Sequence, residues 1–177
     1  MDVLDLYDRG SAWAATKIAG AKQKLDSPTE CEDWSARDLV NHLIDGANYF
    51  AGTAQGKEVA PPGPNPPDLL DGDDPVSAFE ERRREVLEAY KDPKVLEEKG
   101  VTLGIAFSDT LIHGWDLAKG TGQDAKMPPD LAEAAFQMLD GRLTDEIRKG
   151  FFKSPVDVPE TASMQEKLLA YVGRKPG

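Results

Sequence analysis

Apolar residues recur three or four positions apart along most of this chain, and this spacing limits the fold more than any other feature of the sequence. One such helical face consists of Leu39, His42, Leu43, Gly46 and Phe50. No segment shows a convincing alternation of apolar and polar residues, which is the pattern of a half-buried strand. The sequence therefore predicts an all-α fold in which helices pack into a bundle.

Five longer helices and a short terminal one are expected. Their ranges are 2–25, a helix that begins at Ser35, Val76–Tyr90, Gly104–Lys119, Leu131–Lys149 and a last helix within 162–174. The second helix carries the clearest start signal, because the Ser35 hydroxyl can cap it and Asp38 three residues later completes a capping box. Gly120 and Gly122 end the fourth helix. Gly114, in the middle of that helix, indicates a close approach by a neighbouring backbone.

The segment 56–75 differs in composition from the helices around it. Five of the seven residues 61–67 are proline, which removes a backbone donor and disrupts helix interiors and central strands. We expect a long surface loop there, of the kind that forms a lid or a disordered connection between helices. A length of 177 residues predicts a single domain over 1–177, with 150–177 as a C-terminal arm.

The charge balance disfavours nucleic acid as a partner. The chain has 21 Lys and Arg against 32 Asp and Glu, and this net charge of −11 would repel phosphate backbones. The one dense basic cluster, Arg82–Arg84, is flanked by acids, so we expect it to be a solvated helix face.

Three features bear on location. The acidic N-terminus does not have the pattern of a signal peptide, and no apolar run approaches the roughly 20 residues that a membrane span requires. A single cysteine, Cys31, excludes an intrachain disulfide and fits a reducing compartment. We therefore expect a cytoplasmic protein that does not associate with membranes.

The chain has only two histidines, His42 and His113, and both lie in apolar helical segments. Asp109 precedes His113 by four residues, so the two side chains share a helix face and can bind one divalent cation. His42 is the remaining histidine that a facing helix can contribute. Two imidazoles and a carboxylate with open positions suit zinc, iron(II) or nickel better than magnesium or calcium.

Each of these residues also has an ordinary interpretation. A helical histidine is more often a hydrogen-bonded core residue than a ligand, and a carboxylate four residues from a histidine is common by chance. Asp45 and Asp116 lie one turn beyond His42 and His113. They can accept the second ring N–H of a metal-bound imidazole, or they can be ordinary exposed acids.

Other chemistries fit the sequence less well. Glu30 and Glu32 flank Cys31 and disfavour a reactive thiolate. Trp34 and Trp115 are expected to be packing anchors more than surfaces on which a substrate stacks. No G-x-S-x-G, P-loop or G-x-G-x-x-G motif is present.

Three stretches carry a family resemblance. "PTECEDWSARDLVNHLIDG" (28–46) resembles the P-T-x-C-x-x-W-[ST]-x-R-D-L-x-x-H segment of the DinB-like (DinB/YfiT) metal-binding superfamily. More narrowly, it resembles the actinobacterial branch related to the N-terminal domain of mycothiol-dependent maleylpyruvate isomerase. "DTLIHGWDLAKGTGQ" (109–123) is similar to the D-x3-H-G-W-D-L-A-x-x-T-G signature of that branch, and the tail 154–177 resembles its ending.

This resemblance implies an up-down four-helix bundle with extra C-terminal helices and a divalent metal near its centre. Its two histidine ligands fall on His42 and His113, and Asp109 matches a position where the isomerase has glutamate. The segment before the D-x3-H helix, near 100–105, is shorter than in relatives. No clear counterpart of the larger C-terminal domain of the isomerase is present, so isomerase activity itself is not carried over.

Three functions follow as hypotheses. The first is a metal-dependent enzyme, a thiol S-transferase or isomerase that uses a low-molecular-weight thiol such as mycothiol on a small-molecule substrate, with hydrolysis by a metal-activated water as a variant. The second is a non-catalytic module that binds a metal or small molecule, and the third is a helical interaction protein without metal. We expect zinc first, with nickel or iron as alternatives, and the family type implies that the chain can form a homodimer.

Overall fold

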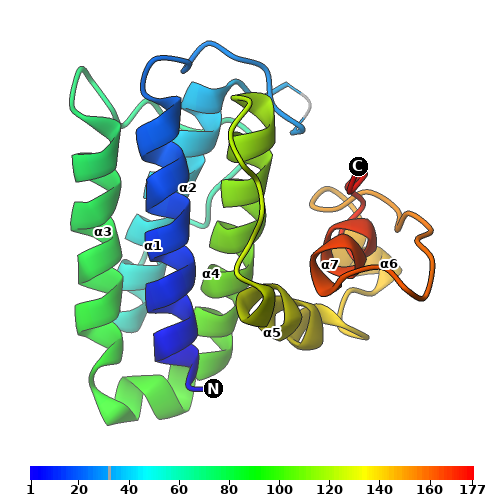
Figure 1. The fold of residues 1–177 in the computed structure, drawn as a ribbon. Helices are drawn as coiled ribbons and strands as arrows, with labels where there is room; N and C mark the ends of the chain where they lie inside the picture. The colour runs from blue at the N-terminus through cyan, green and yellow to red at the C-terminus, as the bar shows by residue number, and fades with distance from the viewer. Residues whose placement is uncertain (32) are drawn as a thin grey trace. The chain divides into compact units, whose positions relative to one another are not determined.

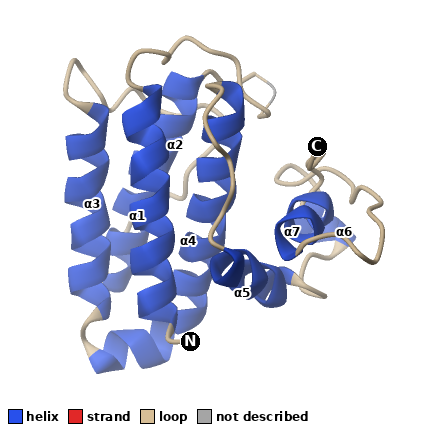
Figure 2. Ribbon diagram, viewed as in Figure 1, coloured by secondary structure: helices blue, strands red, loops and turns tan. Residues whose placement is uncertain are grey.

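The computed structural model describes residues 1–31 and 33–177. Its helices are α1 (Val3–Ala21), α2 (Ala36–Ala54), α3 (Pro75–Tyr90), α4 (Pro93–Gly120), α5 (Pro129–Leu139), α6 (Asp145–Arg148) and α7 (Met164–Tyr171). The described residues form no β-strand, only an isolated bridge between Pro28 and Ser35 (Figure 2). The predicted all-α fold is therefore confirmed. The described residues group into two compact units, Met1–Ala125 and Lys126–Gly177.

Local capping explains where most helices begin. Ser35 caps α2 and forms the predicted capping box, in which its hydroxyl accepts from the Asp38 N–H and the Asp38 carboxylate accepts from the Ser35 N–H. Helices α3 and α4 begin alike, with an aspartate N-cap (Asp74, Asp92) followed by proline at the first helical position.

The fourth helix is longer than predicted, because it begins at Pro93 rather than Gly104. A carboxylate oxygen of Asp92 accepts a hydrogen bond from the Lys94 N–H at 2.9 Å, which fixes a start that the apolar spacing did not indicate. Gly100 lies within this helix, where one glycine costs only about 1 kcal/mol against alanine. The segment 100–105 is thus part of a continuous helix.

The fifth helix is shorter than predicted and ends at Leu139 rather than Lys149. Gly141 has a φ of +71°, a left-handed conformation that a helix cannot continue through. The chain then turns, and Thr144 caps the four-residue helix α6. The short terminal helix is confirmed as α7, which begins with a second capping box between Ser163 and Glu166.

In the unit Met1–Ala125, helices α1 to α4 form a four-helix bundle (Figure 1). Helix α1 packs on α4 and α3, and α2 packs on α3 and α4. Helices α1 and α2 run in opposite directions, and so do α3 and α4, as expected. Helices α2 and α3 instead run in the same direction, because the segment between them travels back along the bundle.

The contacts of residues 55–74 trace this return path. Val59 lies against Gly52 near the end of α2, whereas the Leu69 N–H donates to Oδ1 of Asn41 near its beginning at 2.9 Å. Residues 55–74 form neither helix nor strand, so the long loop expected there is present. Asn41 is 2% exposed, which indicates that its hydrogen bond to the loop is part of the bundle interior.

Close packing between α1 and α4 holds the centre of the bundle together. A Cβ added to Gly114 would lie 2.8 Å from the Trp13 ring and 3.2 Å from Cβ of Ala14, so α1 approaches this mid-helix glycine closely, but through side chains rather than through the backbone that was predicted. Trp115 is 1% exposed, which confirms it as a packing anchor. One apolar core cluster of buried residues contains Ala15, Ile18, Ala21, Ala36, Leu39, Val40, Leu43, Ile44, Leu70, Phe79 and Leu117.

The expectation that Arg82–Arg84 form a solvated face is wrong for Arg83. Its side chain is 11% exposed, and it pairs with Asp8 and with Glu80. Its Nε donates to Oγ of Ser11 at 2.8 Å, which joins α3 to α1. The guanidinium is buried because α1 supplies acceptors that a helix-by-helix interpretation of charge does not include.

In the unit Lys126–Gly177, α5 packs on α7. Arg148 is 9% exposed, donates to the Tyr171 carbonyl at 2.7 Å and lies over the ring of Tyr171. The Val156 N–H donates to the Ala170 carbonyl at 2.9 Å, which fastens the segment before α7 to that helix. Among the described residues, no helix combines the length and apolar character that a membrane crossing needs.

Candidate metal centre

The three side chains predicted as metal ligands converge inside the four-helix bundle. Helix α2 brings His42 to face α4, where Asp109 and His113 lie one turn apart. Nε2 of His42 is 3.5 Å from one carboxylate oxygen of Asp109, and Nε2 of His113 is 3.4 Å from the other. One ligand atom from each residue lies within 4.8 Å of the others, so the three groups surround a space of cation size.

The set is enclosed on the imidazole side and open on the carboxylate side. The side chains of His42 and His113 are 12% and 13% exposed, whereas that of Asp109 is 35% exposed. The two imidazole rings meet edge to face with centroids 4.7 Å apart. A small molecule would therefore reach this set from the side of Asp109.

The electrostatics favour a charged pair when no cation is present. Burial raises the pKa of Asp109, but His113 and His42 outweigh it and hold that pKa well below its ordinary value. Burial lowers the pKa of His113, but Asp109, Asp116 and Cys31 raise it well above its ordinary value. A bound divalent cation would take over the role of the proton on His113.

His42 tests whether these residues fit a metal. Both of its ring nitrogens are buried, and neither has a hydrogen-bond partner in the described part of the chain. A buried polar atom left unpaired costs roughly 1–3 kcal/mol. A cation at about 2.0–2.2 Å from Nε2 would remove that cost for one nitrogen. The orphaned nitrogen and the N, N, O donor set therefore fit zinc, nickel or iron(II).

Trp34 lies directly against the set. Its ring centroid is 4.8 Å from that of His42 and 6.1 Å from that of His113. Its Nε1–H donates to the carbonyl of Pro64 at 2.9 Å. The indole thus joins the proline-rich loop to both histidines, a role that its expected use as a packing anchor does not include. The W-[ST] motif placed Trp34 near the second helix, but the contact with Pro64 depends on how the loop returns.

The structure brings one of the two predicted outer acids to its histidine. Oδ2 of Asp116 lies 3.0 Å from Nδ1 of His113, and the Asp116 side chain is 0% exposed. Asp45 is not brought to His42, since Nδ1 of His42 has no partner among the described residues. The ring of His42 is instead positioned by Trp34 and by the edge of His113.

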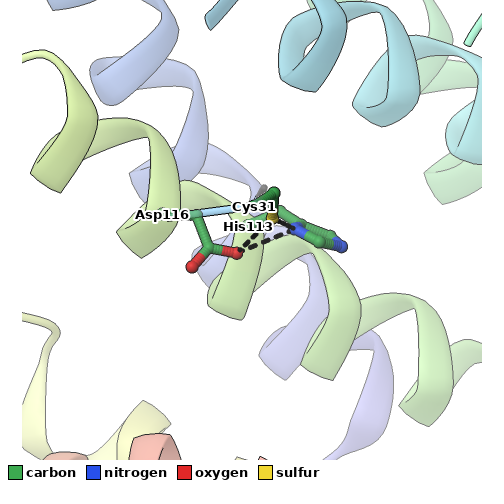
Figure 3. A group of neighbouring side chains, drawn as sticks. All are labelled: Cys31, His113 and Asp116. Carbon is green, nitrogen blue, oxygen red and sulfur yellow. Dashed lines mark hydrogen bonds and ion pairs between the residues drawn. The ribbon is translucent and has the colours of Figure 1, made fainter. Parts of the chain in front are cut away.

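Cys31 also reaches the centre, which the sequence did not predict. Its Sγ lies 3.3 Å from Oδ2 of Asp116 and 3.8 Å from Nδ1 of His113 (Figure 3). The flanking acid Glu32, invoked against a reactive thiolate, lies outside the described residues. The cysteine of the P-T-x-C motif was the one available signal, since the motif includes the residue without giving its contacts.

Comparisons with known proteins identify the family of the chain. The family model of the mycothiol maleylpyruvate isomerase N-terminal domain matches residues 9–118, a span that includes all three candidate ligands. Two proteins of Mycobacterium tuberculosis strains, Uncharacterized protein Rv0738 and Uncharacterized protein MT0763, are each 29% identical over 184 residues, covering 98% of this chain and 98% of their own. No solved structure matches the chain. Because the family match covers more than half of the sequence, the chain belongs to the mycothiol maleylpyruvate isomerase N-terminal domain family, within the DinB-like superfamily.

Proposed function

We propose that this protein is a metal-dependent enzyme that transfers or isomerises a small-molecule substrate with the help of a low-molecular-weight thiol. One observation carries the proposal. His42, Asp109 and His113 form a three-membered donor set, and no fourth histidine, cysteine or acid in the described chain joins it. Catalytic metal sites keep a position open for water or substrate in this way, whereas structural zinc sites are closed by four protein ligands.

The protein side of the mechanism follows from the contacts. His42 and His113 would hold the cation from two helices, and Asp109 would offset part of its charge. Asp116 accepts the Nδ1–H of His113, which leaves Nε2 as the ligand nitrogen. A divalent cation at this position supplies Lewis acidity, which favours the thiolate form of a thiol or the hydroxide form of a water molecule.

The family supports a thiol as the cosubstrate, because the matching domain belongs to a mycothiol-dependent isomerase by name. We propose mycothiol or a related thiol, and zinc before nickel or iron. The electrophile would approach from the exposed edge of Asp109, beside the loop that Trp34 holds through Pro64. The second candidate activity is hydrolysis, since the same open position suits a water molecule.

A conjugation assay tests the proposal. The metal-loaded protein is incubated with mycothiol and a panel of electrophiles, and both the loss of free thiol and the conversion of each electrophile are followed. A second panel of esters and amides is incubated without thiol to detect hydrolysis. Turnover by the wild type that disappears in His42→Ala and persists in Glu97→Gln is the expected result. Glu97 is an exposed residue on the same helix as Asp109 and His113 and serves as the matched control. Thiol turnover equal in wild type and His42→Ala would contradict the proposal.

Metal content separates this function from the other hypotheses. Protein purified without an affinity tag is expected to contain about one equivalent of a divalent metal. Wild-type protein without metal, and without affinity for added zinc, would favour the helical interaction protein. Metal without turnover on either panel would favour the non-catalytic binding module.

A further inference from the structure

The imidazole of His113 has a second set of neighbours at Nδ1, whereas its Nε2 faces Asp109. Figure 3 shows these neighbours, Cys31 and Asp116. We call the group Cys31, Asp116 and His113 the thiol cluster. Oδ2 of Asp116 lies 3.0 Å from Nδ1 of His113 and 3.3 Å from Sγ of Cys31, and the thiol donates to that oxygen. One carboxylate oxygen thus accepts hydrogen bonds from both the ring and the thiol.

Asp116 depends on such donors because of its burial. Its side chain is 0% exposed, so water does not replace a donor that is removed. A buried carboxylate that loses a hydrogen bond rotates toward another donor or is destabilised. Either outcome changes the hydrogen bond that Asp116 makes with Nδ1 of His113.

The position of the thiol is set by contacts outside the cluster. Oγ1 of Thr29 donates to the carbonyls of Trp34 at 2.8 Å and of Cys31 at 3.2 Å, which fixes the shape of the connector between α1 and α2. The connector rests on the end of α4, where a Cβ on Gly120 would lie 2.6 Å from the carbonyl oxygen of Pro28. Cys31 is therefore held against Asp116 by the backbone of the connector.

The thiol cluster could either form hydrogen bonds around His113 or bind a second cation at Nδ1 of His113. The tautomer of His113 decides between these two roles. When Nε2 of His113 binds a cation, Nδ1 carries the ring proton and donates it to Asp116. A cation bound at Nδ1 as well would require the imidazole to lose both ring protons. The hydrogen-bonded role is therefore the one compatible with the candidate metal centre.

We propose that Cys31 is a positioning residue: its S–H holds Asp116 on Nδ1 of His113, and Asp116 in turn keeps Nε2 directed at the metal. This inference rests on the proposed metal centre and does not require that the protein be an enzyme. It gives the single cysteine a role in metal affinity without nucleophilic or ligand chemistry.

Zinc competition titration against a chelating dye tests the role. Removal of outer partners of metal-binding histidines costs about 10–100-fold in affinity. We expect the loss of zinc affinity in Asp116→Asn to fall in that range. In Cys31→Ala we expect zinc affinity to fall about 10-fold at most, because Cys31 acts on His113 only through the hydrogen bond of Asp116. Cys31→Ser is expected to restore affinity to within about twofold, since a hydroxyl donates to Asp116 in place of the thiol. Glu97→Gln is the unchanged control.

Two further measurements separate positioning from a general loss of stability. In circular dichroism melts of the metal-free variants, Cys31→Ser is expected to match the wild type and Cys31→Ala to melt lower because one buried hydrogen bond is lost. A purely structural role would lower the melting temperature without a selective loss of zinc affinity. Side-chain ¹⁵N spectra are simple to interpret, because the chain has two histidines. Zinc-bound His113 is expected as the Nδ1–H tautomer in the wild type and in Cys31→Ser, which keeps the test available if Cys31→Ala does not fold.

Three results would overturn the inference, and the first two are distinguishable from failure of the proposed function. Wild-type zinc affinity in Cys31→Ala would show that the thiol has no role. A thiolate-to-metal charge-transfer band in the cobalt(II)-loaded wild type, absent in Cys31→Ser, would make Cys31 a direct ligand. No zinc binding by the wild type would remove both the centre and the inference. If zinc binds more weakly to Cys31→Ala and the wild type shows no thiol turnover, the inference is supported and only the enzyme function is contradicted.

Discussion

The indole of Trp34 lies against the imidazole of His42 with ring centroids 4.8 Å apart, and its Nε1–H is bonded to the carbonyl of Pro64. One side chain thus connects the candidate metal centre to the loop that passes over it. Trp34→Phe keeps an aromatic ring beside His42 but removes the donor. We expect a stability loss of about 0.5–1.5 kcal/mol and faster amide exchange in residues 57–70. Exchange unchanged in that segment would show that the loop is held by its other contacts, such as Leu69 to Asn41.

Substitution of the candidate ligands is expected to remove metal binding rather than folding. Asp109→Ala and His113→Ala should each weaken zinc affinity at least 100-fold, because a three-ligand set has no spare donor. Asp109→Glu keeps a carboxylate on a side chain that is one methylene longer and is expected to retain measurable affinity. Calorimetric zinc titration of the metal-free protein measures each effect, with Glu97→Gln as the control. Undiminished affinity in Asp109→Ala would exclude the carboxylate as a ligand.

Metal binding is expected to stabilise the fold. At a free zinc concentration of 100 times Kd, a ligand that binds only the folded state adds about 2.7 kcal/mol to the free energy of unfolding. Thermal melts of the wild type should therefore shift upward with zinc, and removal of zinc by a chelator should reverse the shift. His42→Ala should show no shift. An equal shift in His42→Ala would place the stabilising zinc elsewhere.

The affinity for metal is expected to rise with pH. Burial lowers the pKa of His113, but Asp109, Asp116 and Cys31 raise it well above 6.5 in the metal-free protein. Below that pKa a proton must leave His113 before a cation binds, so affinity falls as pH falls and levels off only above it. Zinc titrations over about pH 6–9 measure the profile. Asp116→Asn removes one of the carboxylates that raise the pKa and should move the profile to lower pH. A profile that is flat above the ordinary histidine pKa would contradict this expectation.

Two glycines give opposite predictions for the same substitution. A Cβ at Gly114 would meet the Trp13 ring at 2.8 Å, so Gly114→Ala should destabilise the bundle by about 1–3 kcal/mol despite its gain in helix propensity. A Cβ at Gly46 would come no closer than 4.0 Å to the Phe50 ring, which is an ordinary van der Waals contact. Gly46→Ala should therefore stabilise the protein by about 0.4–1 kcal/mol. Urea unfolding of both variants provides the comparison, and equal effects would contradict the packing seen at Gly114.

Periodicity predicted much of the fold because most helix signals in this chain are local. Ser35 and Asp38 are a capping pair that the sequence shows directly, and the structure contains the same pair. The two helix ends that differ most from the prediction are also set by local signals. Asp92 and Pro93 start α4, and Gly141 stops α5. The burial of Arg83 depends on α1, which no pattern within α3 reveals.

The candidate site also contains residues that the sequence predicted and residues that it did not. His42, Asp109 and His113 were predicted to lie together from helical spacing and family motifs, and the structure brings them together. Cys31 and Trp34 reach the same centre through the connector and the return path of the loop, which are tertiary features. Their positions depend on Gly120 and Pro64, residues far from them in the chain. Spacing alone does not encode such contacts.

The position of a bound metal tests the central claim most directly. Crystals of the zinc-loaded protein, measured on both sides of the zinc absorption edge, would locate the ion by anomalous scattering. We predict one strong peak at about 2.0–2.2 Å from Nε2 of His42, Nε2 of His113 and a carboxylate oxygen of Asp109. A peak bound by Sγ of Cys31 and Nδ1 of His113, or no peak inside the bundle, would contradict it.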